Sequence, residues 1–104
     1  MNYILHLNHI LNRFEKDKRL NPVHVSLYMA CFRQWNSEKF PRWLSISRSE
    51  VMKGARINSK STYHRVIKDL HQWGYLIYKP SQNPRKGSKI RMKKKIVLSV
   101  PNQG

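Results

Sequence analysis

Apolar residues recur at helical spacing near the start of the chain. One stripe, with spacings of three, four and three, consists of Ile4, Leu7, Leu11 and Phe14. Tyr3 and Ile10 widen it, and the pattern predicts an amphipathic helix over residues 3–14. We expect this stripe either to cover the core or to bind a partner, which includes a second copy of the chain in a homodimer.

The next segment is apolar on two sides. One face carries Leu27, Tyr28, Cys31 and Trp35, and the other carries Val25, Met29 and Phe32. Such a pattern is typical of a central helix that is packed on both sides. Asn21 is suited to cap this helix and Pro22 to open its first turn.

Shorter elements follow. NSEKFPR is a loop and WLSI is a candidate strand. SRSE at 47–50 has the form of a capping box, so Ser47 and Glu50 predict a short helix through about Lys53. We expect this helix to turn Val51 and Met52 inward. Gly54 can take the left-handed conformation that ends such a helix.

Residues 60–73 predict a third core helix, capped by Asn58 or Ser59. At 100° per residue one side gathers Tyr63, Val66, Ile67 and Leu70, which must face the core. The opposite side gathers Ser61, Arg65, Lys68 and Gln72, flanked by Thr62 and His64. Asp69, the only acid of the segment, lies on a flank.

A β-hairpin is predicted after Gly74. YLIYK is rich in β-forming residues, and the prolines, glycine and asparagine of PSQNPRKGS predict a loop. KIRMKKKIVLSV alternates. One parity, broken only by Lys94, carries Ile90, Met92, Ile96, Leu98 and Val100, and the other carries Lys89, Arg91, Lys93 and Lys95. The returning strand is therefore expected to be apolar on one face and cationic on the other.

These elements predict one mostly helical α+β domain over residues 1–104. It comprises an N-terminal helix and linker (1–20), a helical core with a short strand (21–73) and a hairpin (74–100). A short capped helix, a tight turn and a helix with a polar outer face form a helix-turn-helix, here at 47–73. A following hairpin that acts as a wing would make the domain a winged helix.

Charge narrows the function to polyanion binding. Twenty-one Lys and Arg against five Asp and Glu give a formal net charge of +16, and no acid follows Asp69. A charge of this size opposes compaction, so it favours nucleic acid as a partner. No apolar run approaches the ~20 residues of a membrane span, and the N-terminus lacks a signal-peptide layout. We expect a cytoplasmic, nucleoid-associated protein with no membrane partner.

The motif also carries a family resemblance. ISRSEVMKGARINSKSTYHRVIKDLHQWGYLIYK resembles the bacterial winged helix-turn-helix domains in its Ser-capped helix, Gly-containing turn, S-K-S-T opening and L-x-x-x-G-x-[LI] ending. The match covers residues 43–100. The N-terminal part is similar to small helix-turn-helix proteins of Bacteroidetes that are linked with mobile elements.

The resemblance implies double-stranded DNA as the partner. In this family the second helix of the motif enters the major groove, which implies base contacts from Ser61, Thr62 and Arg65. Phosphate contacts would come from Ser59, Lys60 and Lys68. His64 and Gln72 complete this helical set, and the expected wing and backbone set is Arg85, Lys86, Lys89, Arg91 and Lys93. The implied role is transcription regulation, or an accessory role in replication or excision of a mobile element.

Catalysis and metal binding find no support in the sequence. Five scattered acids form no cluster of metal-holding carboxylates, and there is no glycine-rich phosphate loop. His6 and His9 lie three apart but lack Cys or carboxylate companions. We therefore expect neither an enzyme nor a cofactor.

Two other functions stay open. The N-terminal stripe favours a protein-interaction module of a replication-initiation assembly. Aromatic residues favour RNA or single-strand binding if they are exposed rather than buried. The candidates are Trp35, Trp43, Trp73, Tyr75 and Tyr78.

Overall fold

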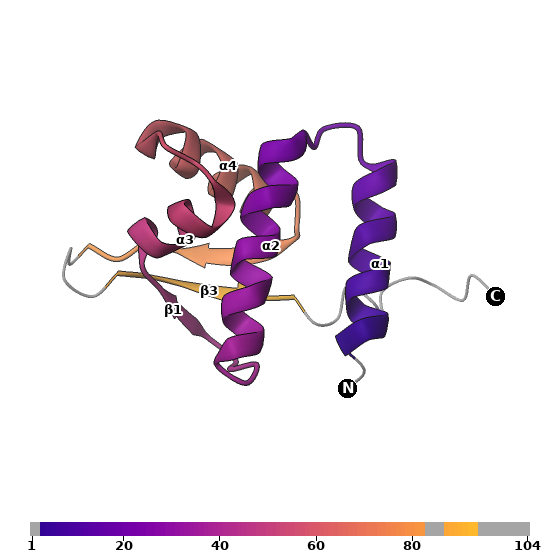
Figure 1. Cartoon of the computed structure of the whole chain (residues 1–104), viewed down its shortest axis with the longest axis horizontal. Coiled ribbons are helices and arrows are strands. Elements are labelled where there is room, and N and C mark those ends of the chain that lie inside the picture. Colours follow the sequence, from indigo (N-terminus) through magenta and orange to yellow (C-terminus); the bar gives the residue numbers. More distant parts are fainter. Residues whose placement is uncertain (1–2, 83–86, 94–104) are drawn as a thin grey trace.

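The domain is α+β and mostly helical (Figure 1). The computed structural model describes residues 3–82 and 87–93. Within them the helices are α1 (Tyr3–Lys16), α2 (Pro22–Ser37), α3 (Arg48–Ala55) and α4 (Lys60–Gln72). The strands in the same ranges are β1 (Leu44–Ile46), β2 (Leu76–Lys79) and β3 (Ser88–Met92). None of the helices in these ranges is long and apolar enough to cross a bilayer.

Helix α2 is the centre of the core, as its two apolar faces predict. Its buried side chains are His24, Leu27, Tyr28, Cys31, Phe32 and Trp35. Val25 and Met29 are half-buried and pack against the same core. Burial raises the pKa of the Cys31 thiol to about 12, which keeps it protonated.

The start of α2 is capped as predicted. The Asn21 side chain accepts hydrogen bonds from the Val23 and His24 amides, at 3.0 and 3.4 Å. His24 Nδ1 accepts one from the Asn21 amide at 3.1 Å, which closes a capping box. Pro22 occupies the first turn, where its missing N–H leaves no hydrogen bond unmade.

Helix α1 buries a face that overlaps the predicted one but is rotated from it. Its buried residues are His6, Ile10 and Phe14, whereas Ile4 is 75% exposed and Leu11 is 42% exposed. Phe14 and the half-buried Leu7 therefore cover the core, as one of the two predicted alternatives has it, whereas Ile4 and Leu11 do not.

Aromatic rings explain the rotation of α1. The Tyr3 ring stacks on Phe40 with centroids 3.5 Å apart, and it meets Trp35 edge-on at 5.6 Å. The His6 ring lies 5.8 Å from Trp35. Rings bury more area than aliphatic side chains of similar length, so the face that carries them packs against α2.

Polar side chains fix the other end of α1 to the turn after α4. Arg13 Nη2 donates to the Trp73 carbonyl at 2.7 Å, and its guanidinium lies 4.0 Å from the Tyr75 ring centroid. Asp17 accepts hydrogen bonds from the Tyr75 hydroxyl and from Arg19, both at 2.7 Å. These five residues form the α1 clamp, which holds α4 and β2 in place.

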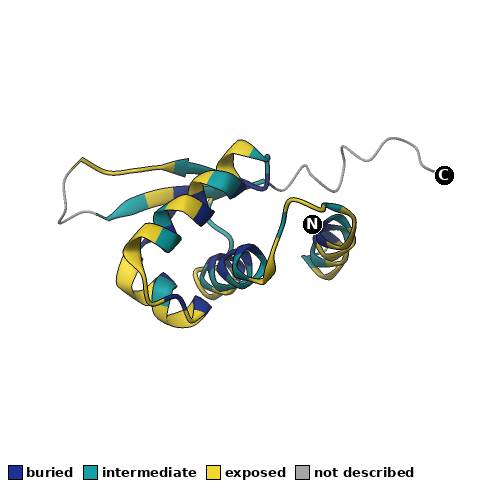
Figure 2. Cartoon of the chain, turned by 90° about the horizontal axis from the view of Figure 1, so that it is seen from above, coloured by how far each residue is buried: buried dark blue, intermediate teal, exposed yellow. Residues whose placement is uncertain are grey.

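The three strands form one antiparallel sheet in the order β1-β3-β2. The predicted hairpin is confirmed, with Tyr78 opposite Ile90 and Lys79 opposite Lys89. Strand β1 joins its free edge, with Leu44 also opposite Ile90. Helices cover one face of this sheet and leave the other face open (Figure 2).

Alternation along the strands decides which residues lie on each face. The inner face carries Leu44, Ile46, Leu76, Tyr78, Ser88, Ile90 and Met92. The outer face carries Ser45, Ile77, Lys79, Lys89 and Arg91. The predicted division of β3 into an apolar and a cationic face is confirmed through Met92, and residues 94–100 lie outside the described residues.

Two predicted details of α3 were wrong. Gly54 lies inside the helix, which continues to Ala55 and ends at Arg56 with φ 61°. The helix can extend because Ile57, the next apolar residue, donates its amide to the Met52 carbonyl and enters the core. Ser47 is the N-cap residue, but its hydroxyl pairs with Ser49 at 3.0 Å instead of capping an amide.

Two glycines are required by the backbone. Gly74 ends α4 as predicted, with φ 85°. Gly87 has φ 66°, and a Cβ there would lie 2.7 Å from the Ile46 carbonyl oxygen. Any other residue at position 87 would push β1 away from the hairpin.

We predict that Asp17→Asn weakens the α1 clamp. Hydrogen bonds from Arg19 hold the pKa of Asp17 well below its usual range. The charged acceptor is lost in Asn, so the free energy of unfolding at pH 7 should fall by about 1–2 kcal/mol in urea denaturation. A depressed folded-state pKa stabilises the fold above the unfolded value near ~4. The difference between wild type and variant should therefore shrink as the pH falls below about 4.

Glu15→Gln is the matched control, because Glu15 is an exposed acid two residues away. Its substitution should change the free energy of unfolding by less than about 0.5 kcal/mol. Equal effects of the two variants at pH 7 would contradict a specific role for Asp17.

Candidate nucleic-acid interface

The exposed face of α4 collects the polar residues predicted for it. Ser61, Arg65, Lys68 and Gln72 are exposed, and Thr62 and His64 are half-buried. The opposite face buries Tyr63, Val66, Ile67 and Leu70, as the spacing predicts. Because this apolar face is buried against the core, the helix backbone that carries the exposed side chains is held in place.

The N-terminus of α4 is built from hydroxyl groups. Ser59 is the N-cap, and its Oγ accepts a hydrogen bond from the Thr62 amide at 3.2 Å. Ser61 Oγ lies 2.9 Å from Ser59 Oγ. Both serines and Lys60 are exposed. A helix N-terminus surrounded by donors attracts anions, and phosphate groups in particular.

The only acid of α4 is half-buried at the side of this exposed face and is bound to α2. Asp69 accepts a hydrogen bond from His24 Nε2 of α2 at 2.9 Å. His24 Nδ1 already accepts from a backbone amide, so the Nε2 position carries the proton. Asp69 therefore joins α4 to α2 rather than repelling an anion at the surface.

Arg65 stays available despite its position one turn before Asp69. Its Nη1 lies 3.8 Å from the Asp69 carboxylate, and the Arg65 side chain is 56% exposed. An exposed pair at this spacing contributes only about 0.3–0.5 kcal/mol. A phosphate or a guanine edge can therefore replace Asp69 as the partner of the Arg65 guanidinium with little loss of free energy.

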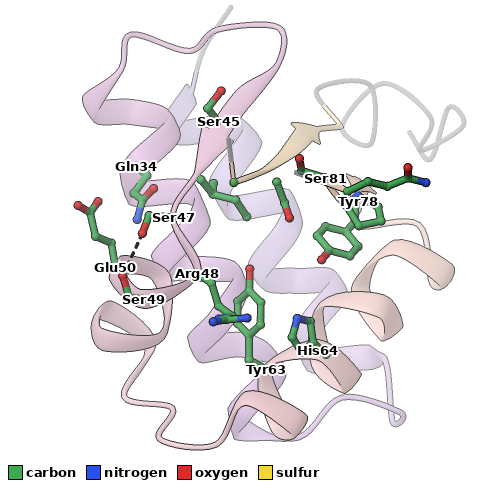
Figure 3. A pocket seen from close by; sticks show the side chains of 15 residues that line it. Gln34, Ser45, Ser47, Arg48, Ser49, Glu50, Tyr63, His64, Tyr78 and Ser81 are labelled. Carbon is green, nitrogen blue, oxygen red and sulfur yellow. Dashed lines mark hydrogen bonds between the residues drawn. The ribbon is translucent and has the colours of Figure 1, made fainter. Parts of the chain in front are cut away.

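An open cleft of about 760 Å³ lies between the start of α3, the start of α4 and the base of the hairpin (Figure 3). Arg48 comes from α3, and Tyr63 and His64 come from α4. Tyr78, Ser81 and Ser88 line the hairpin side. Most of these groups can donate hydrogen bonds, and Glu50 is the acid among the lining residues.

Tyr63 links the core to this cleft. Its ring is buried, and its hydroxyl points into the cleft beside Arg48 (Figure 3). Burial raises the pKa of Tyr63, so its hydroxyl stays protonated and can donate at neutral pH. Arg48 and Tyr63 thus supply two donors at the entrance to α4.

The predicted hairpin residues fall into two groups. Lys89 is exposed and Arg91 and Lys93 are half-buried. Strand alternation puts Lys89 and Arg91 on the outer sheet face, whereas Ser61, Arg65, Lys68 and Gln72 leave the core on α4. Arg85 and Lys86 lie outside the described residues.

Sequence reasoning missed the contribution of Arg48 and Tyr78. The capping-box pattern of SRSE depends on its serine and glutamate and gives no role to the arginine between them. Tyr78 was grouped with core and strand aromatics, and the structure places it half-buried on the rim of the cleft. Arg48 lies 15 positions before Tyr63, and this spacing carries no local signal that could have placed both residues in one cleft.

His6 and His9, which lie three residues apart on α1, have different surroundings. His6 is buried against aromatic rings, and His9 is half-buried. Across residues 3–82 and 87–93, no three His, Cys, Asp or Glu side chains come together in a way that could hold a metal ion.

Comparison with protein-family models, with curated proteins and with solved structures gave no match. The assignment of function therefore depends on the geometry and the charge of the chain itself.

We predict that Ser59→Ala lowers the free energy of unfolding by about 1 kcal/mol, because the Thr62 amide loses its capping partner. Ser59→Asp should retain wild-type stability, since Asp caps a helix as well as Ser does. Chemical denaturation of the two variants and of Ser61→Ala measures this. An equal loss in Ser61→Ala, whose hydroxyl caps no amide among the described contacts, would contradict the assignment of Ser59 as the cap.

Proposed function

We propose that the protein binds double-stranded DNA in a sequence-specific manner as a winged helix-turn-helix domain. In this proposal α3, the turn at 56–59 and α4 are the helix-turn-helix, and the hairpin of β2 and β3 is the wing. The role would be transcription regulation, or an accessory role in replication or excision of a mobile element. The protein would then act at the nucleoid in the cytoplasm.

One observation carries this proposal. The exposed face of α4 presents hydroxyl, guanidinium, ammonium and amide groups, and its only acid is bound to α2. A solvated helix surface usually mixes both signs of charge. The exposed face of α4 carries positive charges without such a mixture of acids.

The proposed contacts follow from the chemistry of each side chain. Arg65 can donate two hydrogen bonds to a guanine edge, and Gln72 can pair with an adenine edge. Ser61 and Thr62 lie in the first turn, which penetrates deepest when a helix enters the major groove. Lys60 and Lys68 would contact phosphates on either side of the groove.

The cleft extends this interface toward the hairpin. We infer that the sugar–phosphate backbone beside the contacted groove lies across it. Arg48, His64 and the Tyr63 hydroxyl would then donate to phosphate oxygens. Arg85 and Lys86, the expected wing contacts, lie between β2 and β3 in the sequence and outside the described residues.

The net charge of +16 supports a large electrostatic share of the affinity. Each phosphate neutralised by Lys or Arg releases counterions, so binding should weaken steeply as salt increases. This contribution is independent of sequence. Specificity must come from the α4 side chains that reach base edges.

We predict that Arg65→Ala removes part of the discrimination between sites. A cognate duplex is first obtained by selection from a random duplex library, and fluorescence anisotropy then measures its affinity and that of random duplex. The preference for the cognate duplex should fall by about 1–3 kcal/mol. Enrichment of no motif, or equal losses on both duplexes, would contradict base reading by α4.

Lys16→Ala is the matched control for Arg65. Lys16 is an exposed cation in the last turn of α1, outside the proposed interface. Its removal should lower both affinities slightly and leave the ratio between them unchanged. Ser59→Asp adds a second comparison, because it keeps the helix cap but places a negative charge where a phosphate is expected.

A second function, self-association, is favoured by the apolar edge of α1. Ile4 and Leu11 lie seven residues apart on one side of the helix and remain exposed in the monomer. A second copy of the chain could pair with this edge, and a dimer would read a two-fold symmetric site.

For this function we predict that wild-type protein is a dimer by light scattering and that Leu11→Glu is a monomer. A charge placed in an apolar interface loses its hydration, which separates the two copies. Asn12→Glu is the control, because Asn12 is exposed on a different side of α1. A wild-type monomer at micromolar concentration would exclude this second function.

A further inference from the structure

The outer face of the sheet carries cations that no acid balances. Lys79 and Lys89 are directly opposite each other on β2 and β3, and Arg91 follows on the same face. The five acids of the chain lie at 15, 17, 38, 50 and 69, so none belongs to a strand. Among residues 3–82 and 87–93, none of these three cations forms an ion pair with an acidic side chain.

Such an arrangement lowers the stability of the fold. Like charges that face each other across neighbouring strands repel, and Lys89 is on the central strand, where neither neighbour offers an acid. No acidic side chain among the described residues therefore explains the lysine pair. An external polyanion would turn this repulsion into attraction.

An exposed indole lies among the same cations. Trp43 directly precedes β1 and is 38% exposed, while Trp35 and Tyr75 are fully buried and Trp73 is half-buried. Lys79 Nζ lies 5.9 Å from the Trp43 ring centroid, although their strands are separated by β3. The ring therefore lies on the outer face of the sheet.

We propose that this outer face is a second nucleic-acid site, which takes a single-stranded segment. One unpaired base would stack on Trp43, and the adjoining phosphates would contact Lys79, Lys89 and Arg91. Stacked aromatic rings beside a row of cations are the combination that single strands require, since every base offers a π-face. A paired duplex keeps its bases inside and cannot use the exposed indole.

This site is separate from the one proposed for duplex DNA. Inner-face residues such as Ile90 and Met92 are buried between the outer face and the helices, so the two surfaces look in different directions (Figure 2). The inference does not depend on the proposed function of α4, and each surface can fail its own test.

The test measures binding of 12-nucleotide oligo(dT) and oligo(rU) by fluorescence anisotropy at matched salt, beside a hairpin duplex. Trp43→Ala should weaken binding of the single strands about 5- to 150-fold. Trp43→Phe should weaken it much less, because a phenyl ring still stacks. Duplex affinity should be unchanged in both variants.

Charge and site are then separated by matched variants. Lys89→Gln should weaken single-strand binding more than Lys16→Gln does, since Lys16 lies on α1. Arg65→Ala should reduce duplex binding and leave single-strand binding unchanged. Oligo(dT) should also quench the tryptophan fluorescence of wild type but not of Trp43→Phe.

Three results would overturn the proposal. They are the absence of single-strand binding by wild type at low salt, an unchanged affinity in Trp43→Ala, and equal losses of duplex and single-strand binding in Trp43→Ala. If Trp43→Ala fails to fold by circular dichroism, the comparison of Lys89→Gln with Lys16→Gln decides the question alone. Preference between oligo(dT) and oligo(rU) identifies DNA or RNA as the natural strand.

Discussion

The rest of the structure depends on the burial of α2 on both of its sides. Trp35 meets the aromatic face of α1 on one side, and the other side receives α3 and α4. Hydrogen bonds reinforce this packing, because Ser26 donates to the Ala55 carbonyl of α3 and His24 binds Asp69 of α4. A chain of 104 residues has room for one such core. The orientation of α4, and with it every proposed base contact, is therefore set by what α2 buries.

Few acids and many cations impose a second constraint on this core. Two of the five acids are used at joints between elements, Asp17 in the α1 clamp and Asp69 between α2 and α4. These two carboxylates hold the elements together through hydrogen bonds, and Asp69 does so while bound to α2 rather than exposed on the outer face of α4. The same placement that stabilises the fold leaves its outer cations unneutralised. The stability of the fold and the proposed binding of a polyanion would both follow from one distribution of charge.

The sequence predicts the fold well in those elements where the periodicity of apolar residues alone decides which face is buried. In α4 the apolar and polar positions separate cleanly, so its buried face and its Ser59 cap were both correct. The buried face of α1 is rotated from the predicted stripe because the His6 ring packs against Trp35, and an apolar pattern gives no weight to a histidine. The pairing of β1 with β3 joins residues about 45 positions apart and has no local signal. The cleft depends on that pairing and on tertiary packing, so its lining could not be foreseen.

Strand alternation explains why this small domain has two cationic surfaces instead of one. In β3 the apolar Ile90 and Met92 must point toward the helices, and Lys89 and Arg91 are then forced to the opposite face. A shift of one residue would bring the cations toward α4, but it would bury Lys89 and Arg91 and expose the apolar pair. Desolvation of two unpaired charges is far more unfavourable than their mutual repulsion at the surface. The hydrophobic core therefore separates the cations of the sheet from those of α4, and any nucleic acid bound by both must wrap around the domain or come from two different strands.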